Sequence, residues 1–114
     1  MDRYFHGGAP KLKKILPPSI TQAPSCASYG AAAVCRRDRV YLTKDVREAM
    51  IFAALHPSDR GTVYEVRPVG AVENDPDYLG PPGQCVAVES ADVIGVIPVK
   101  RKELFKIRKW VLTT

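Results

Sequence analysis

Hydrophobic and polar positions alternate along several short stretches of this chain. The alternation from Thr62 to Pro68 predicts a strand with two different faces. Runs of small and β-branched residues predict two further strands, from Cys85 to Glu89 and from Val93 to Val99. Aromatic and β-branched residues at 3–6 and 39–43 predict two earlier strands. Most of the regular structure is therefore expected to be β.

One segment between these strands follows a helical period instead. Its apolar residues fall three and four positions apart, as one face of a helix requires: Val46, Ala49, Met50, Ala53 and Ala54. We expect Thr43 to be the N-cap and Asp45 to add negative charge in the first turn. His56 precedes Pro57, and a residue before proline is disfavoured in a helix, so the helix is expected to end there.

The remaining segments are less regular. The pattern predicts a helical turn over Lys11 to Leu16 and a long loop, rich in proline, serine and alanine, over Pro17 to Arg37. We expect Ser90 to Asp92 to connect the last two strands, and Lys100 to Lys109 to be either strand or helix. Strands segregated from few helices indicate an α+β fold, with two small packed sheets around a cleft.

Length and composition favour a single globular domain over residues 1–114. The chain has 114 residues, of which 46% are hydrophobic and 25% charged, as in ordinary globular proteins. Its apolar runs are much shorter than the roughly 20 residues that a membrane helix needs. The residues after Met1 lack the apolar stretch of a signal peptide. We therefore expect a cytoplasmic protein with no membrane partner.

The cysteines and histidines argue against a metal site. The three cysteines, Cys26, Cys35 and Cys85, are odd in number and lack C-x-x-C spacing, which is unlike a disulfide framework or a zinc ribbon. His6 and His56 lie fifty positions apart and form no local ligand pair. Cys85 near His6 could act as a nucleophile, but a small residue entering a strand is the more ordinary interpretation.

The formal net charge of +5 is concentrated near the C-terminal end. The basic residues there are Lys100, Arg101, Lys102, Lys106, Arg108 and Lys109. Such a patch can attract nucleic acid or another polyanion, although it can also be an ordinary solvated surface.

Three short strings carry the most specific chemistry, and each places a polar residue at the end of an expected strand. The strings are Arg3-Tyr4-Phe5-His6-Gly7-Gly8, Val40-Tyr41-Leu42-Thr43 and Glu73-Asn74-Asp75-Pro76. The two glycines after His6 let a nucleotide approach the backbone, because glycine has no Cβ. Tyr41 can stack on a flat ring and still offer a hydroxyl. Asp75 can accept hydrogen bonds from sugar hydroxyls.

In this order, and with the alanine-rich helix after Thr43, the strings resemble the rifampin ADP-ribosyltransferase family. The resemblance implies an NAD-dependent ADP-ribosyltransferase fold, with NAD as co-substrate and no metal. His6 would hold the adenosine-side ribose, with Gly7, Gly8 and Thr43 also in the cofactor site. Tyr41 would stack on nicotinamide and Asp75 would stabilise the cation formed as nicotinamide leaves. His6, Tyr41 and Asp75 are thus the expected catalytic set.

The resemblance leaves the acceptor of ADP-ribose open. Gly8 stands where the family usually carries a hydroxyl residue, and the loop from Pro17 to Arg37 differs from the family's. A rifamycin-like small molecule, a protein or a nucleic acid are the candidate acceptors, in a resistance or toxin-like role. Two other interpretations are an RNA 2′-phosphotransferase, which would need more arginines near His6 than Arg3, and a catalytically silent module that binds a partner through the basic C-terminal face.

Overall fold

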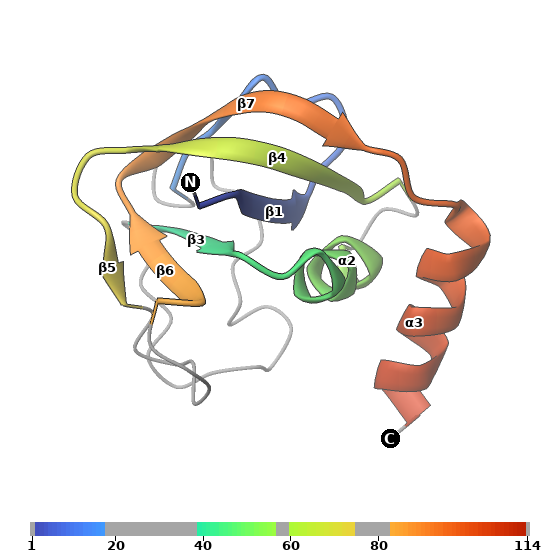
Figure 1. Ribbon diagram of the computed structural model, residues 1–114. Coiled ribbons are helices and arrows are strands. Elements are labelled where there is room, and N and C mark those ends of the chain that lie inside the picture. Colours follow the sequence, from blue (N-terminus) through green and yellow to red (C-terminus); the bar gives the residue numbers. More distant parts are fainter. Residues whose placement is uncertain (1, 18–38, 57–59, 75–82, 114) are drawn as a thin grey trace.

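Seven antiparallel strands and two helices make up the part of the chain described by this computed structural model, residues 2–17, 39–56, 60–74 and 83–113 (Figure 1). The strands are β1 (Tyr4–Gly8), β2 (Lys14–Ile15), β3 (Val40–Thr43), β4 (Thr62–Val69), β5 (Glu73–Asn74), β6 (Cys85–Val88) and β7 (Ser90–Ile97), and the helices are α2 (Val46–Leu55) and α3 (Arg101–Thr113). The predicted α+β class is confirmed.

The sheet is strongly curled. Its strand order is β2-β7-β4-β1-β3-β6-β5, so three strands separate β6 from β7. A single residue, Glu89, nevertheless connects these two strands in sequence, which is possible only if the sheet bends back on itself. Both ends of the sheet then contribute to one core on the inner face: Ile15, Val40, Leu42, Tyr64, Val66, Val86, Val88 and Ala91. The connection predicted over Ser90 to Asp92 is wrong, because these residues already pair with β4 and β2.

The sheet consists of two halves with a narrow join. One half is β2-β7-β4-β1 and the other is β3-β6-β5, and the described pairing between β1 and β3 is the one pair Phe5–Thr43. By contrast, β1 pairs with β4 along its whole length, from Tyr4 to Gly8. The two small sheets expected from the sequence are therefore two halves of one continuous sheet.

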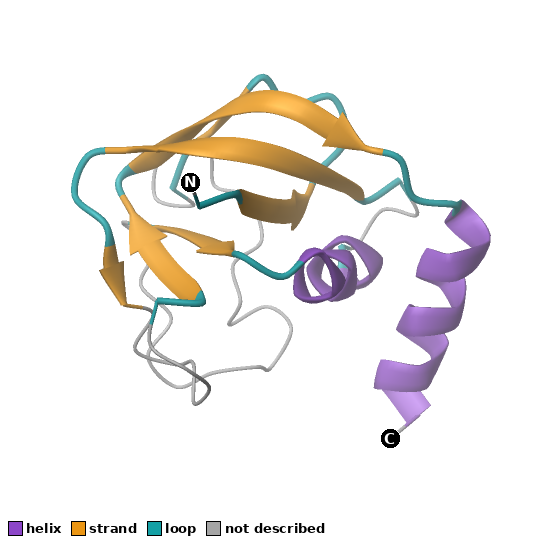
Figure 2. Cartoon of the chain, viewed as in Figure 1, coloured by secondary structure: helices purple, strands orange, loops and turns teal. Residues whose placement is uncertain are grey.

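The helix α2 lies against β1 on the face opposite to the inner core, and α3 packs beside α2 (Figure 2). The predicted apolar stripe of α2 is confirmed, since Ala49, Ala53 and Ala54 are buried against Phe5 and Val63. The contact is very close: a Cβ atom on Gly7 would lie 1.9 Å from the carbonyl oxygen of Ala49. Glycine in β1 and alanine in α2 thus let the helix backbone rest directly on the strand.

The start of α2 differs from the prediction. Asp45 is the N-cap, and its side chain accepts a hydrogen bond from the Arg47 backbone nitrogen at 2.8 Å. Thr43 is instead the last residue of β3, and its hydroxyl accepts from the Asp45 nitrogen at 3.0 Å. Cross-strand pairing with Cys85 holds Thr43 in the sheet, so the helix begins two residues later than a Thr43 cap would require. The helix ends at Leu55, as predicted.

Tertiary contacts determine the secondary structure of two further segments. The helical turn predicted over Lys11 to Leu16 is wrong, because Lys14 and Ile15 pair with the edge of β7 and bury the Ile15 side chain. The segment after Lys100, which periodicity left undecided, is the helix α3. In the described part of the chain, no helix has the length and apolar character needed to span a bilayer.

Candidate functional site

His6 lies at the join between the two halves of the sheet. Its Nδ1 atom is 3.1 Å from the backbone oxygen of Tyr41, just past the Phe5–Thr43 pair. The imidazole thus satisfies a carbonyl of β3 beyond the point where the described β1–β3 ladder ends. The first two sequence strings, far apart along the chain, meet through this contact.

Burial lowers the pKa of His6 from its usual value, although the hydrogen bond to Tyr41 opposes this effect. The imidazole is therefore neutral near pH 7. A carbonyl oxygen can only accept a hydrogen bond, so the Nδ1 atom must carry the proton and the Nε2 atom is left as an acceptor. This tautomer can accept a hydrogen bond from a hydroxyl group of a ligand.

The two glycines after His6 have different surroundings. A Cβ atom on Gly8 would lie 2.9 Å from Nε2 of His6, so the imidazole ring occupies the space above this glycine. Gly7 faces α2, and its missing side chain is required for the contact with Ala49. Gly7 thus has a packing role whether or not it also meets a nucleotide.

Tyr41 and Thr43 face the side of the sheet that carries α2. Thr43 pairs with Phe5, which is buried against that helix, and alternate residues of a strand share a face. By the same alternation, His6 points to the inner face together with Tyr64, its partner on β4. The structure therefore brings His6 to the backbone of Tyr41, and the two side chains belong to opposite faces.

The first two residues of the third string, Glu73 and Asn74, form β5 and lie in the same half of the sheet as Tyr41. Tyr41 pairs with Ala87, and Ala87 pairs with Glu73, so these residues form one row across β3, β6 and β5. Tyr41 and Glu73 are two strand spacings apart, roughly 10 Å. Glu73 also forms a 3.8 Å ion pair with Arg39 at the start of the second string. Asp75, the expected catalytic carboxylate, lies outside the described residues.

A polar cluster around Glu48 extends this face beside Thr43. The carboxylate of Glu48 accepts from the Thr43 hydroxyl at 3.1 Å, from the Gln84 amide at 3.1 Å and from the Cys85 thiol at 2.9 Å. The hydroxyl of Thr43 is thus engaged within the protein, which favours a positioning role. The sequence analysis missed this cluster. The Asp45-x-x-Glu48 spacing, which is typical of a capping box, was the available signal.

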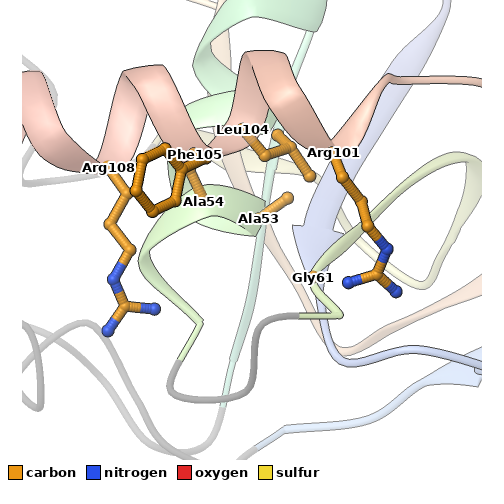
Figure 3. Close-up of a pocket in the computed structure, with 7 residues that line it drawn as sticks. All are labelled: Ala53, Ala54, Gly61, Arg101, Leu104, Phe105 and Arg108. Atoms are coloured by element: carbon orange, nitrogen blue, oxygen red, sulfur yellow. The ribbon is translucent and has the colours of Figure 1, made fainter.

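Cys85 has no imidazole partner among these contacts, since its thiol donates to Glu48. No group of three or more potential metal ligands occurs within the described ranges. A separate cleft of about 190 Å³ opens between α2 and α3, and its lining includes Ala53, Gly61 and Leu104 but no described residue of the three strings (Figure 3). The polar chemistry predicted from the sequence therefore lies along β1, β3 and β5 and does not contribute a described residue to the lining of this cleft.

No protein-family model matches the chain, and no curated protein sequence matches it. The function is therefore inferred from the chemistry of the residues that the fold brings together. A neutral imidazole whose Nε2 atom can accept a hydrogen bond suits a sugar hydroxyl, and an aromatic ring in a row with a carboxylate suits a flat, cationic ring.

Proposed function

We propose that this protein binds NAD and transfers its ADP-ribose group to an acceptor nucleophile. The observation that carries the proposal is the convergence of the three strings. His6 meets the Tyr41 backbone at 3.1 Å, and Glu73 lies in one cross-strand row with Tyr41. His6 and Tyr41 are 35 residues apart in sequence, and Tyr41 and Glu73 are 32 apart. Proximity along the chain therefore does not explain why the three strings lie together.

In the proposed site, Nε2 of His6 accepts a hydrogen bond from the adenosine-side ribose. Because the side chains of Tyr41 and His6 belong to opposite faces, NAD would have to pass the join between β1 and β3. The ring of Tyr41 would then stack against nicotinamide, whose positive charge favours an electron-rich face. The carboxylate of Asp75 stabilises the oxocarbenium character that develops on the other ribose, an interaction that strengthens in the transition state. Glu73, two residues before Asp75 in sequence, is paired with Arg39 and is not needed as a second charge.

The reaction is a substitution at the anomeric carbon of the nicotinamide ribose. The bond from this carbon to the nicotinamide nitrogen breaks, and its electron pair leaves with nicotinamide, which becomes neutral. A lone pair on the acceptor forms the new bond, and the acceptor loses its proton to a base or to water. The protein's contribution is the positioning of NAD and the stabilisation of charge.

The RNA 2′-phosphotransferase alternative gains no support from the surroundings of His6. Arg3, the arginine nearest to His6 in sequence, donates to both carboxylate oxygens of Glu65, at 3.1 and 2.9 Å. Its guanidinium is therefore already paired across β1 and β4, and a 2′-phosphate would have to compete with this pair.

Two variants of His6 test the proposal by separating its two nitrogen atoms. Asparagine in place of His6 can still donate to the Tyr41 carbonyl, as Nδ1 does, but it has no group at the position of Nε2. Glutamine can place an oxygen acceptor near the Nε2 position but gives up the contact with Tyr41. We expect His6→Asn to weaken NAD binding about tenfold, and His6→Gln to weaken it less.

The measurements are NAD affinity by calorimetry and nicotinamide release over time, with a rifamycin, a protein extract or RNA as acceptor in separate arms. Asp75→Asn should bind NAD and release little nicotinamide. Equal NAD affinity and release in wild type, His6→Asn and Asp75→Asn would refute the proposal. A wild-type protein that neither binds nor cleaves NAD would instead be the catalytically silent module.

A further inference from the structure

The net positive charge of the protein is concentrated in α3 and in Lys100, the residue before it. From Lys100 to Thr113 there are six basic residues and one acid, which is a formal charge of +5 and equals the +5 of the complete chain. The other residues are therefore balanced, with eleven basic and eleven acidic side chains. A charge this concentrated creates a directed positive field at one side of the protein.

The lysines of α3 form a ridge between two exposed aromatic residues. At 3.6 residues per turn, Lys102, Lys106 and Lys109 fall on the middle of the outward arc. Phe105 lies on one side of this ridge and Trp110 on the other, and the two are 68% and 64% exposed. Phe105–Lys109 and Lys106–Trp110 are both spaced four residues apart, so each ring lies about one turn from an ammonium group.

The inward side of α3 holds the helix in place independently of this arc. Leu104 is buried against α2, and the Arg108 guanidinium donates to the backbone oxygen of His56 at 3.1 Å. In Figure 3, Arg101 and Arg108 extend from opposite ends of the segment that carries Leu104 and Phe105, above Ala53 of α2. The lysine ridge and the exposed aromatic rings lie outside these inward contacts of α3.

We propose that this surface of α3, comprising Lys102, Phe105, Lys106, Lys109 and Trp110, binds single-stranded nucleic acid. The lysines would contact phosphates, while unpaired bases would stack on Trp110 and Phe105. This proposal does not rest on NAD chemistry, although a bound strand would also be a candidate acceptor for ADP-ribose.

The arrangement of residues on the arc favours nucleic acid over a membrane surface. A helix that lies in a bilayer interface has apolar residues at the centre of its outward face and basic residues along the flanks. On α3 this order is reversed, because the lysines are central and the aromatic rings flank them. A partner that offers both phosphates and flat rings fits this order.

The experiment uses the full-length protein and a fluorescein-labelled 20-nucleotide poly(U) strand. Trp110 is the only tryptophan of the chain, so its fluorescence reports directly on base stacking. We expect binding at low salt with quenching of Trp110, and a steep loss of affinity as salt rises. Trp110→Ala should weaken binding roughly tenfold. Lys106→Gln/Lys109→Gln should reduce the slope of log affinity against log salt by about 1.4, the value for two lost phosphate contacts.

The matched control is Lys13→Gln/Lys14→Gln, which removes the same charge from exposed positions at the sheet edge. It should lower affinity only slightly, and circular dichroism should confirm that all variants are folded. Polyphosphate serves as a polyanion without bases, and anionic lipid vesicles test the membrane alternative. The proposal is overturned by absence of binding at low salt, by equal effects of the two double variants, by polyphosphate binding as tight as that of poly(U), or by binding to vesicles alone.

Discussion

The two helices α2 and α3 are held in very different ways, because α2 packs on the sheet and α3 packs mainly on α2. The backbone of α2 lies directly against Gly7 of β1. In its first turn, Glu48 accepts three hydrogen bonds, one from Thr43 of β3 and two from Gln84 and Cys85 at the start of β6. α3 is held along one side, with Leu104 as its buried residue, and exposes most of its charge. The position of α2 is therefore fixed by contacts with the strands, whereas α3 is held along one side only.

The two helices illustrate two ways in which a protein can form a binding surface. Beside α2, the strands that carry His6 and Tyr41 are fixed by backbone contacts, so a small displacement would disturb a site that needs defined geometry. On α3, the proposed nucleic-acid surface would act through charge and stacking, which tolerate some freedom of the side chains. We therefore expect substitutions near α2 to act through the fold and substitutions on α3 to act through affinity.

The largest effect is expected from Gly7→Ala. The added Cβ would lie 1.9 Å from the Ala49 oxygen and 2.7 Å from the Ala53 nitrogen, both backbone atoms that cannot rotate away. The helix would have to move off β1, so the free energy of unfolding should fall by about 3 kcal/mol or more. Urea denaturation followed by circular dichroism measures this change.

Gly95→Ala is the matched control for this substitution. It makes the same chemical change in a strand of the same sheet, but a Cβ there meets no atom within 4 Å. Its stability should stay within about 0.5 kcal/mol of wild type. Similar stabilities for the two variants would show that α2 does not rest on Gly7 as the structure describes.

A smaller effect is expected from Glu48→Ala. Thr43, Gln84 and Cys85 would lose their common acceptor at a half-buried position, which should cost about 2 kcal/mol of unfolding free energy. Glu103→Ala is the counterpart, because Glu103 is the third residue of α3 just as Glu48 is the third residue of α2. Both changes alter the helix dipole equally, so their difference isolates the polar cluster. Equal losses would contradict the assignment of the cluster.

The sequence predicted an element correctly where its local pattern of apolar residues matches the contacts that it makes in the fold. The buried face of α2 and its end follow from the alanine stripe and from His56-Pro57, and β4 follows from regular alternation. Lys14 and Ile15 were mispredicted because they become a strand only by pairing with β7, a partner about 75 residues away. Such pairing adds hydrogen bonds and burial that local propensity does not record.

For the candidate site, the sequence singled out three strings, whose functional roles stay predictions, but did not indicate which way their side chains face. It singled out His6 and Tyr41, yet the alternation that sets their side chains on opposite faces depends on the Phe5–Thr43 register. The Glu48 cluster was missed because its donors come from residues 5 to 37 positions away. Both features are consequences of strand order, which a single sequence does not encode locally.

The smallest effect, and the one that contrasts the two regions most directly, is that of mild acid. Burial lowers the pKa of His6 in the folded protein, whereas an unfolded histidine titrates near about 6.5. The unfolded chain therefore binds the proton more readily, so stability is complete above this value and falls as the pH drops below it, by at most about 1.4 kcal/mol per pH unit. The loss should be absent from His6→Gln, measured by urea denaturation at a series of pH values. Both histidines of the chain lie outside α3, so poly(U) affinity at pH 6 should equal that at pH 7. A stability profile of wild type that parallels the profile of His6→Gln would show that His6 is not the group that responds.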